Sequence, residues 1–418
     1  MSPDSAIPKF FALSHQERLN ILRDSAALSD DEVRVLGQSS GGIGFTQADR
    51  MIENAVGTFS LPVGIATNFR VNNRDYLVPL AIEEPSVVAA ASKGAKTARI
   101  LGGFTAQADE SYIIGQIQVL GAQKDAIAKI AASEEEILKL ANSQSSTLRR
   151  LDKGAKGISC KVIHTDADDM LVVELLIDAG DAMGANVTNS MCETVAPLIE
   201  RISGGTVLLK ILSNYSTRRM VRVTATFEAE AVGGPDAVNG VINAYRFAKY
   251  DVNRAVTHNK GIMNGITAAA TATGQDSRAI EAAAHAYAAR DGTYRSLTEW
   301  SQNSDGDLVG RLEMPLAVGV VGGVTKVHPV ARICIKILGV KTAGELACVM
   351  AATGLAQNYS AIRALATEGI QKGHMKLHAR NLAAAAGASP DQVDGIALAM
   401  IASGSISLDH AKRLVREG

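Results

Sequence analysis

The sequence has no surplus of charge of either sign and few cysteines. Its 42 Lys and Arg residues balance 43 Asp and Glu residues, which leaves a formal net charge of −1 over 418 residues. Because proteins that bind nucleic acid usually carry a basic stripe, and none is present, we expect no nucleic-acid partner. The four cysteines form no CxxC pair, which argues against a disulfide framework and against a zinc ribbon.

Long apolar segments are missing as well. The uncharged stretch 54–69 is interrupted by Gly, Pro and Asn and is too short for a membrane-spanning helix. The first ten residues lack the charged and apolar regions of a secretory signal. The sequence therefore predicts a soluble, cytoplasmic protein with no membrane contact. Its 47% of apolar residues are enough for a large core in two or three structural units.

The middle of the chain alternates between strand and helix patterns. Period-two alternation over 112–121 predicts a strand, and apolar residues at helical spacing over 124–142 predict a helix. Two β-branched runs, a helix and a last strand follow, which gives the order β-α-β-β-α-β of a ferredoxin-like unit. These later segments are 158–165, 170–178, 182–201 and 206–214.

The predicted fold class is therefore α+β, with three parts. Residues 1–108 and 216–373 form a large domain of mixed helices and strands, and residues 109–215 form a ferredoxin-like domain inserted into it. Residues 374–418 form a C-terminal helical appendage that is able to move as a flap.

An acidic pair, Glu83 and Glu84, follows the predicted strand 76–82. Taken alone, the pair is best interpreted as a strand end surrounded by solvent. The alternative is a carboxyl group at a strand terminus, desolvated enough to hold a proton near neutral pH and to act as an acid or base.

A charged cluster precedes the glycine-containing segment 261–265, and its members are Arg254, His258, Asn259 and Lys260. Such a cluster is usually a solvated helix end. Alternatively, Lys260 stabilises an oxyanion while Arg254 and Asn264 hold an acidic substrate. Asp276 is either an ordinary helix cap or a neighbour of Lys260 that tunes the pKa of its ammonium group.

Two histidines, His374 and His378, lie four residues apart on a predicted helix. No HExxH glutamate and no third ligand accompany them, so we predict no metal site. A proton-donating histidine is more plausible than a ligand, and without further context a surface histidine is more plausible than either.

No G-x-G-x-x-G segment opens a helix after a strand. The segment 181–186, Asp-Ala-Met-Gly-Ala-Asn, does follow the predicted strand 170–178 and begins a helix. Its glycine would let the backbone approach a phosphate, and the helix N-terminus would favour an anion. Nucleotide binding is therefore only weakly indicated by these residues alone.

Seven segments along the chain, taken together, are similar to one protein family. They resemble the soluble, bacterial class II form of 3-hydroxy-3-methylglutaryl-CoA (HMG-CoA) reductase, over nearly the whole chain. The segments are ENAVGTFSLPVGIATNF (53–69), VPLAIEEPSVVAAAS (78–92), DAMGAN (181–186), THNKGIMNGI (257–266), VGGVTKVHP (321–329), LAQN (355–358) and ATEGIQKGHMKLHARN (366–381).

The resemblance implies a role for each matching residue. It makes the large domain the CoA- and HMG-binding domain, the inserted domain the NAD(P)-binding domain, and the appendage a mobile flap that carries a catalytic histidine. The implied catalytic residues are Glu84, Lys260, Asp276 and His374. The implied substrate-binding residues are Ser86, Arg254 and Asn264. The implied cofactor-binding residues are Asp181, Met183, Gly184 and Asn186, with Asn214 as a weaker candidate.

The implied reaction belongs to the mevalonate pathway of isoprenoid metabolism. Two NADPH or NADH molecules reduce the HMG-CoA thioester to mevalonate and free CoA, through a hemithioacetal and an aldehyde, without a metal. Lys260 would stabilise charge on the reacting oxygen and His374 would protonate the CoA thiolate. Glu84, held protonated by burial near other acids, would deliver a proton, and Asp276 would link it to Lys260. The family also implies a homodimer or higher homo-oligomer with active sites at the subunit interface.

One position departs from the family members that prefer NADH. Those members have an acidic residue just after the segment that matches Leu140–Asn142, where it binds the adenosine ribose diol and repels a 2′-phosphate. Here that position is Ser145, and Arg149 and Arg150 follow closely. We therefore predict that NADPH is accepted and is preferred over NADH.

Two other classes of function remain as alternatives. A non-catalytic protein that binds a CoA thioester or a nucleotide, as a sensor or scaffold, would have no turnover to lose when Lys260 is replaced. A zinc hydrolase built on His374 and His378 predicts metal in the purified protein, whereas the reductase predicts none.

Overall fold

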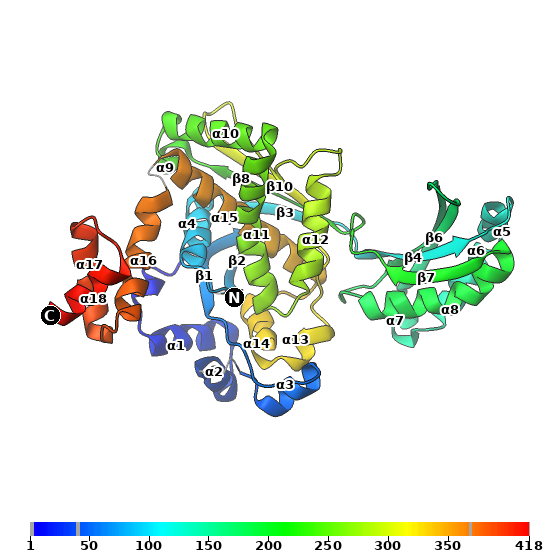
Figure 1. The fold of residues 1–418 in the computed structure, drawn as a ribbon, viewed down its shortest axis with the longest axis horizontal. Helices are drawn as coiled ribbons and strands as arrows, with labels where there is room; N and C mark the ends of the chain where they lie inside the picture. The colour runs from blue at the N-terminus through cyan, green and yellow to red at the C-terminus, as the bar shows by residue number, and fades with distance from the viewer. Residues whose placement is uncertain (1–3, 39–41, 368–369, 418) are drawn as a thin grey trace.

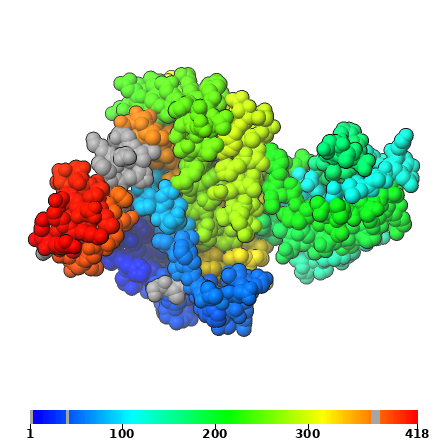
Figure 2. Space-filling view, viewed as in Figure 1, coloured from blue at the N-terminus to red at the C-terminus, as the bar shows by residue number. Residues whose placement is uncertain are grey.

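The computed structural model describes residues 4–38, 42–367 and 370–417, and the side chains of all of these except 370–377. Figure 1 shows a larger body at the centre, a smaller body at one end and a helical C-terminal unit at the other. The space-filling view shows the same three lobes in one row (Figure 2). Helices and two separate sheets make up the described chain, so the predicted α+β class is confirmed.

The larger body is built around a six-stranded sheet. Its strands lie in the order β2-β1-β3-β8-β10-β9, and every described neighbour pair is antiparallel except β1 with β3. The strands are β1 (Val63–Val71), β2 (Arg74–Ala81), β3 (Phe104–Ala108), β8 (Met220–Phe227), β9 (Thr298–Gln302) and β10 (Leu308–Pro315).

Helices pack on this sheet and on one another. The long central helix α15 (Ala343–Ala366) packs against the helices α4 (Val87–Arg99) and α11 (Val252–Ala272), and all three helices also contact strands of the sheet. Its alanine-rich sequence allows close approach, since a Cβ at Gly94 of α4 would clash with the carbonyl group of Ala356. The other helices of this body are α1 (His15–Ala26), α2 (Asp30–Gly37), α3 (Phe45–Met51), α9 (Ala229–Val232), α10 (Pro235–Tyr250), α12 (Ser277–Ala288), α13 (Gly323–Val327) and α14 (Pro329–Leu338).

The smaller body is a four-stranded sheet with helices on one face. Its strands lie in the order β5-β6-β4-β7, and all neighbours are antiparallel. Alternate residues of β4, such as Ile113 and Ile117, are buried, as period-two alternation requires. Its elements are β4 (Tyr112–Leu120), α5 (Ala126–Ala132), α6 (Glu134–Asn142), α7 (Ser146–Arg150), β5 (Gly154–Ile163), β6 (Met170–Asp178), α8 (Ala185–Ser203) and β7 (Thr206–Leu212).

Three helices follow α15 and share a small core of their own. They are α16 (Ile370–Ala385), α17 (Pro390–Ala402) and α18 (Leu408–Glu417), which pack around Ala383, Ala397 and Met400. In the part of the chain that the structure describes, no helix is both long and apolar enough to span a membrane.

Candidate active site

Glu84 and Lys260 meet although 176 residues separate them in the chain. Glu84 lies in the short turn between β2 and α4, and Lys260 lies in the middle of α11. The Lys260 Nζ donates to Glu84 Oε2 at 2.7 Å. The two side chains are 59% and 37% exposed, so the ion pair contributes little to stability. Both charged groups are accessible to a ligand.

Asn264 lies one turn after Lys260 on the same face of α11, because residues four apart share a helix face. Its Nδ2 is 3.5 Å from the same Oε2 atom of Glu84. Three of the residues proposed from the sequence, one carboxylate, one ammonium group and one amide, are thus brought together by the fold.

The resemblance implies that Glu84 is buried near other acids, and within the single chain it is not. Residues 83–86 form a partly exposed turn after β2, and the partners of the Glu84 carboxylate are the Lys260 ammonium group and the Asn264 amide. The physical reason is that Pro85 and the start of α4 at Val87 keep this turn at the rim of the sheet.

The two other proposed substrate-binding residues, Ser86 and Arg254, differ in how they lie relative to the Glu84–Lys260 pair. Ser86 has a left-handed backbone conformation, with φ 77°, at the N-cap of α4. A non-glycine residue rarely adopts this conformation, and such strain is concentrated at functional sites. Arg254 is six residues before Lys260, which rotates it by about 240° around α11. No described contact joins Arg254 to the Glu84–Lys260 pair, and burial lowers the pKa of its guanidinium group.

Two residues beside Lys260 anchor its helix, which corrects the interpretation of this cluster as a solvated helix end. His258 is 1% exposed, and its Nε2 lies 2.7 Å from Thr298 Oγ1. Burial lowers the pKa of His258 to about 3. Asn259 donates to the carbonyl of Arg295 at 2.8 Å and accepts from the N–H of Leu297 at 3.0 Å. These bonds hold α11 against the start of β9 and fix the direction in which Lys260 points.

Gln357 is a polar group whose role the sequence does not reveal. It lies on α15, 5% exposed, and its Oε1 is buried without a hydrogen-bond partner among the described residues. A Cβ at Gly265, which follows Asn264, would lie 3.1 Å from the Cβ of Gln357. The only signal in the sequence is its place in the LAQN segment, which assigns it no role.

Asp276 is not brought to Lys260 within this chain. It caps α12, accepting from the N–H groups of Arg278 and Ala279 at 3.1 Å each, and it pairs with the Arg278 guanidinium at 3.3 Å. Ala272, the end of α11, is twelve residues after Lys260, or about 18 Å further along the helix. The structure therefore shows the helix-cap role of Asp276 and no contact with Lys260.

The segment Asp181–Asn186 lies between β6 and the N-terminus of α8. Gly184 has φ 88°, and a Cβ there would clash with the side chains of Ile113 and Ala179. No side chain caps α8, which is 19 residues long. Its first N–H groups therefore have no side-chain acceptor, an arrangement that suits a phosphate or diphosphate group.

This turn is bonded to the larger body. The Asp181 carbonyl accepts from the N–H of Val320 at 2.9 Å, and its carboxylate accepts from the N–H of Ala343 at 2.8 Å. Gln275 donates to the carbonyl of Gly319 at 3.0 Å and accepts from its N–H at 2.9 Å. The turn is therefore linked through residues 319–320 to the residue that precedes Asp276.

A pocket of about 470 Å³ opens between these segments. Residues of the turn, Asp276 and Arg278 all line this pocket, although the turn and Asp276 belong to separate sequence motifs. Its remaining wall includes the glycine-containing loop at 319–325. The residues of the turn that line it are Ala182, Met183, Gly184, Ala185 and Asn186.

Four further residues proposed from the sequence for cofactor binding lie at the same end of the four-stranded sheet as the turn 181–186. They are Ser145, Arg149, Arg150 and Asn214. Ser145 caps α7 and accepts from the N–H of Leu148 at 3.2 Å, and the exposed Arg149 and Arg150 end that helix. The strand that follows, β5, begins opposite Asp178, the last residue of β6. Asn214 follows β7, where the N–H of Ser213 donates to Ile114 near the start of β4. All four residues thus lie toward the sheet end that carries the turn.

His374 lies on α16, but its side chain is outside the residues whose side chains the structure describes. His378 is exposed. Among the described residues, no group of three or more His, Cys, Asp or Glu side chains is placed to hold a metal ion.

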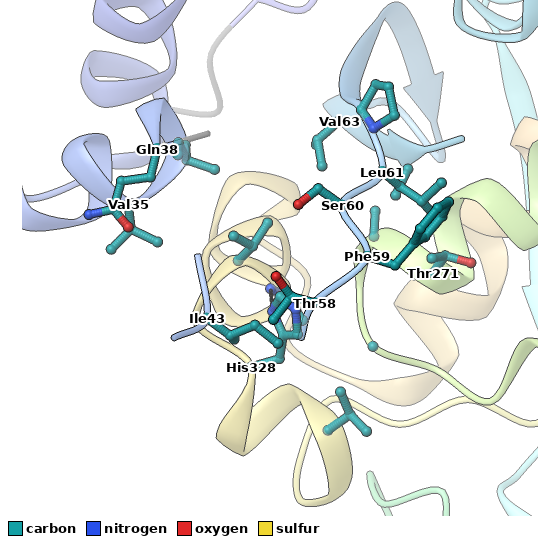
Figure 3. A pocket seen from close by; sticks show the side chains of 18 residues that line it. Val35, Gln38, Ile43, Thr58, Phe59, Ser60, Leu61, Val63, Thr271 and His328 are labelled. Atoms are coloured by element: carbon teal, nitrogen blue, oxygen red, sulfur yellow. Dashed lines mark hydrogen bonds between the residues drawn. The ribbon is translucent and has the colours of Figure 1, made fainter. Parts of the chain in front are cut away.

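A second cleft, of about 370 Å³, opens just beyond the end of β2 (Figure 3). The segment 58–63 forms one wall, and Figure 3 shows Phe59 and Thr271 on one side with His328 and Ile43 on another. Ala81, three residues before Glu84, also lines it. The cleft therefore lies next to the end of β2, which Glu84 follows by three residues.

Comparisons with known proteins agree with one another. The family model described as hydroxymethylglutaryl-coenzyme A reductase matches residues 14–379. A 3-hydroxy-3-methylglutaryl-coenzyme A reductase from Archaeoglobus fulgidus is 53% identical over 413 residues, which cover 98% of this chain and 94% of that protein. A probable reductase of the same name from Borreliella burgdorferi is 35% identical, over 79% of this chain and 77% of that protein.

Solved structures give the same result. A 3-hydroxy-3-methylglutaryl-coenzyme A reductase from Streptococcus pneumoniae superposes with a TM-score of 0.83 at 39% identity, covering 98% of this chain and 99% of that chain. A second structure from that organism, described as the class II enzyme bound to NADPH in open conformations, gives a TM-score of 0.82 at 39% identity, over 97% and 99% of the two chains.

Proposed function

The chain belongs to the hydroxymethylglutaryl-coenzyme A reductase family, and from that premise we propose which of its residues carry out the reaction. The protein is an NAD(P)H-dependent oxidoreductase that interconverts HMG-CoA with mevalonate and CoA in a four-electron reaction. The observation that carries the assignment of the site is the contact between Lys260 and Glu84.

Lys260 acts on the reacting oxygen of the substrate. Negative charge develops on this oxygen when the thioester and later the aldehyde are reduced, and a nearby ammonium group stabilises such charge most strongly where it is already in place. Glu84 accepts from the same ammonium group in the single chain; a carboxylate of a second chain, Asp276, placed beside it would favour uptake of a proton from solvent, which Glu84 then delivers to the reduced oxygen. Asn264 lies within reach of both groups and binds the substrate hydroxyl or carboxylate, together with Ser86 and Arg254.

The uncapped N-terminus of α8 and Gly184 support a binding site for the cofactor diphosphate. Each of two successive nicotinamide molecules, when bound, would supply one of the two hydrides. Met183, Asn186 and Asn214 orient it at the pocket that also contains Asp276. His374 protonates the departing CoA thiolate, so that the thiolate does not attack the aldehyde again.

Asp276 completes the site from a second copy of the chain. The approximate 18 Å of helix between Lys260 and the end of α11 keeps the two residues apart within one chain, although the proposed chemistry requires them together. A homodimer with its active sites at the subunit interface resolves this conflict.

The division of the chain follows from these assignments. Residues 109–215 bind the nucleotide, residues 1–108 and 216–373 bind HMG-CoA and form the dimer, and residues 374–418 form the flap with His374. The separate buried clusters of the three lobes support this division. A cytoplasmic location fits the four cysteines, all of which are free thiols.

The reaction is tested by following the absorbance of the reduced nicotinamide with purified protein and HMG-CoA. We expect two NADPH molecules to be oxidised for each HMG-CoA consumed, and reduced nicotinamide to form when mevalonate, CoA and NADP⁺ are supplied instead. Binding of NADPH and of CoA without turnover in either direction would favour the non-catalytic sensor or scaffold.

Replacing Ser145 by Asp should reverse the cofactor preference. A carboxylate at the cap of α7 accepts from the ribose diol of NADH and repels the 2′-phosphate of NADPH. We expect the ratio of kcat/KM for NADPH over NADH to exceed one in the native protein and to fall at least about tenfold in S145D, by the scale of one lost charged contact. Equal saturated rates with much tighter NADH binding in the native protein would contradict the preference. Ser143→Asp, on the same turn, is the matched control.

A further inference from the structure

Arg219 is a buried arginine at the junction of the two sheets. It lies in the segment that returns from β7 to β8, directly before the first residue of β8, and it is 4% exposed. Burial lowers the pKa of its guanidinium group to about 10, so the group is charged at neutral pH. A buried charge is costly unless polar groups compensate for it.

The compensation comes mainly from carbonyl groups of the nucleotide-binding turn and the loop behind it. Nη1 donates to the carbonyl of Met183 at 3.0 Å. Nη2 donates to the carbonyl of Val318 at 2.6 Å, with longer contacts to Ala182 O at 3.5 Å and Ser111 Oγ at 3.4 Å. A single guanidinium group thus joins the turn to the larger body.

No carboxylate among the described residues forms an ion pair with Arg219. The nearby Asp178 and Asp181 attract it at longer range, but their hydrogen bonds go elsewhere: Asp178 bonds to Lys153 and to the N–H of Gly180, and Asp181 bonds to the N–H of Ala343. The positive charge of Arg219 is therefore not neutralised by direct contact.

This charge lies directly against the turn that precedes α8. The turn carbonyls that accept from Arg219 belong to Ala182 and Met183, and α8 begins at Ala185. The helix N-terminus and the fixed cation beside it act in the same direction, because both favour a ligand with negative charge. The Asp181 carboxylate in the same turn opposes part of this effect.

We propose that Arg219 is a positioning residue for the nicotinamide dinucleotide. It holds the carbonyls of Ala182 and Met183 so that the N–H groups that follow face the ligand, and it adds positive potential beneath the diphosphate. The proposal rests on the proposed function, since it takes the turn to be the cofactor site. Arg219 touches neither the cofactor nor the substrate, and it acts through the turn.

The test compares three variants of the full-length protein. Arg219→Met keeps the length of the side chain and removes its charge and all its donors. Arg219→Lys keeps the charge but cannot donate in a fork to carbonyls on two sides. Arg222→Met is the matched control, because Arg222 lies three residues further along, is partly exposed, and pairs with Asp109 and Glu313 on the surface.

Binding is measured apart from turnover, by titrating NADPH fluorescence and by titrating CoA calorimetrically. We expect the Kd and KM for NADPH to rise about tenfold or more in R219M, which corresponds to the loss of one or two hydrogen bonds. A smaller rise is expected in R219K. The KM for HMG-CoA, the Kd for CoA and kcat at saturating NADPH should stay within about twofold of the native values, and R222M should match the native protein.

Each other outcome has a definite meaning. An unchanged NADPH Kd in folded R219M, or an equal loss of affinity for both ligands, overturns the positioning role. If R219M does not fold, as shown by circular dichroism, the result rests on R219K, where an unchanged NADPH Kd overturns the proposal and a selective rise supports it. If the native protein does not bind NADPH, the proposed function itself has failed, and the native titration alone reveals this.

Discussion

Lys260→Ala is expected to lower kcat about 10²- to 10³-fold, the usual cost of removing one group that stabilises developing charge in an active site. The substitution should slow the catalytic step without changing the stability of the fold or the binding of NADPH. Because Lys260 and Glu84 are both well exposed, the variant keeps its fold, and its thermal unfolding should resemble that of the native protein. NADPH binding, which we propose at the turn before α8, should be unchanged.

The measurement is steady-state oxidation of NADPH with HMG-CoA, beside a fluorescence titration of NADPH binding. Lys249→Ala is the matched control, since Lys249 is an exposed lysine on the adjacent helix α10. A K260A protein with near-native kcat would falsify the assignment of Lys260, and a parallel loss of NADPH binding would mean that the residue acts through structure.

Asp276→Asn is also expected to abolish turnover, and a mixture of two inactive variants should restore part of it. If Asp276 of one subunit serves the Lys260 of the other, a dimer of one K260A chain and one D276N chain contains one intact site and one doubly altered site. Random assembly makes half of the dimers mixed, so co-expression of the two variants should recover about a quarter of native activity.

The control for this experiment is co-expression of K260A with the double variant K260A/D276N, which has no native Lys260 in any dimer and should stay inactive. If co-expressed K260A and D276N show no more activity than either variant alone, while size-exclusion chromatography and affinity-tag capture prove that mixed dimers formed, then Lys260 and Asp276 act within the same chain. The interface proposal would then be wrong.

Local sequence patterns predict the four strands of the smaller body and its last helix, because each has its own period. The single helix predicted over 124–142 is two helices, α5 and α6, and the short helix α7 is not predicted. The alternation around Ile113 and Ile117 requires a strand with one buried face, and the structure has that strand. The same reasoning cannot show which helix packs on which strand. The meeting of Glu84 with Lys260 depends on contacts over 176 residues, and it was reached through resemblance to a family.

The burial of several polar residues could not be predicted, because it depends on contacts between segments that are distant in the sequence. His258 and Asn259 were interpreted as part of a charged, solvated cluster, yet they are buried and bonded to residues 295–298. Arg219 is one of two consecutive arginines in a linking segment, and nothing in its neighbours distinguishes a buried guanidinium group from an exposed one. The resemblance implies a Glu84 buried near other acids, whereas in the single chain the turn 83–86 leaves its side chain 37% exposed.

Helix α15 connects two distant parts of the molecule mechanically. Its first N–H, at Ala343, is held by the Asp181 carboxylate in the turn before α8, and its last residue, Ala366, lies shortly before the helix that carries His374. The 24-residue rod is about 36 Å long, and 16 of its residues are buried, so it resists bending. The rod therefore keeps its two ends at a fixed separation and direction, so the start of α16 is positioned relative to the turn by the same packed helix.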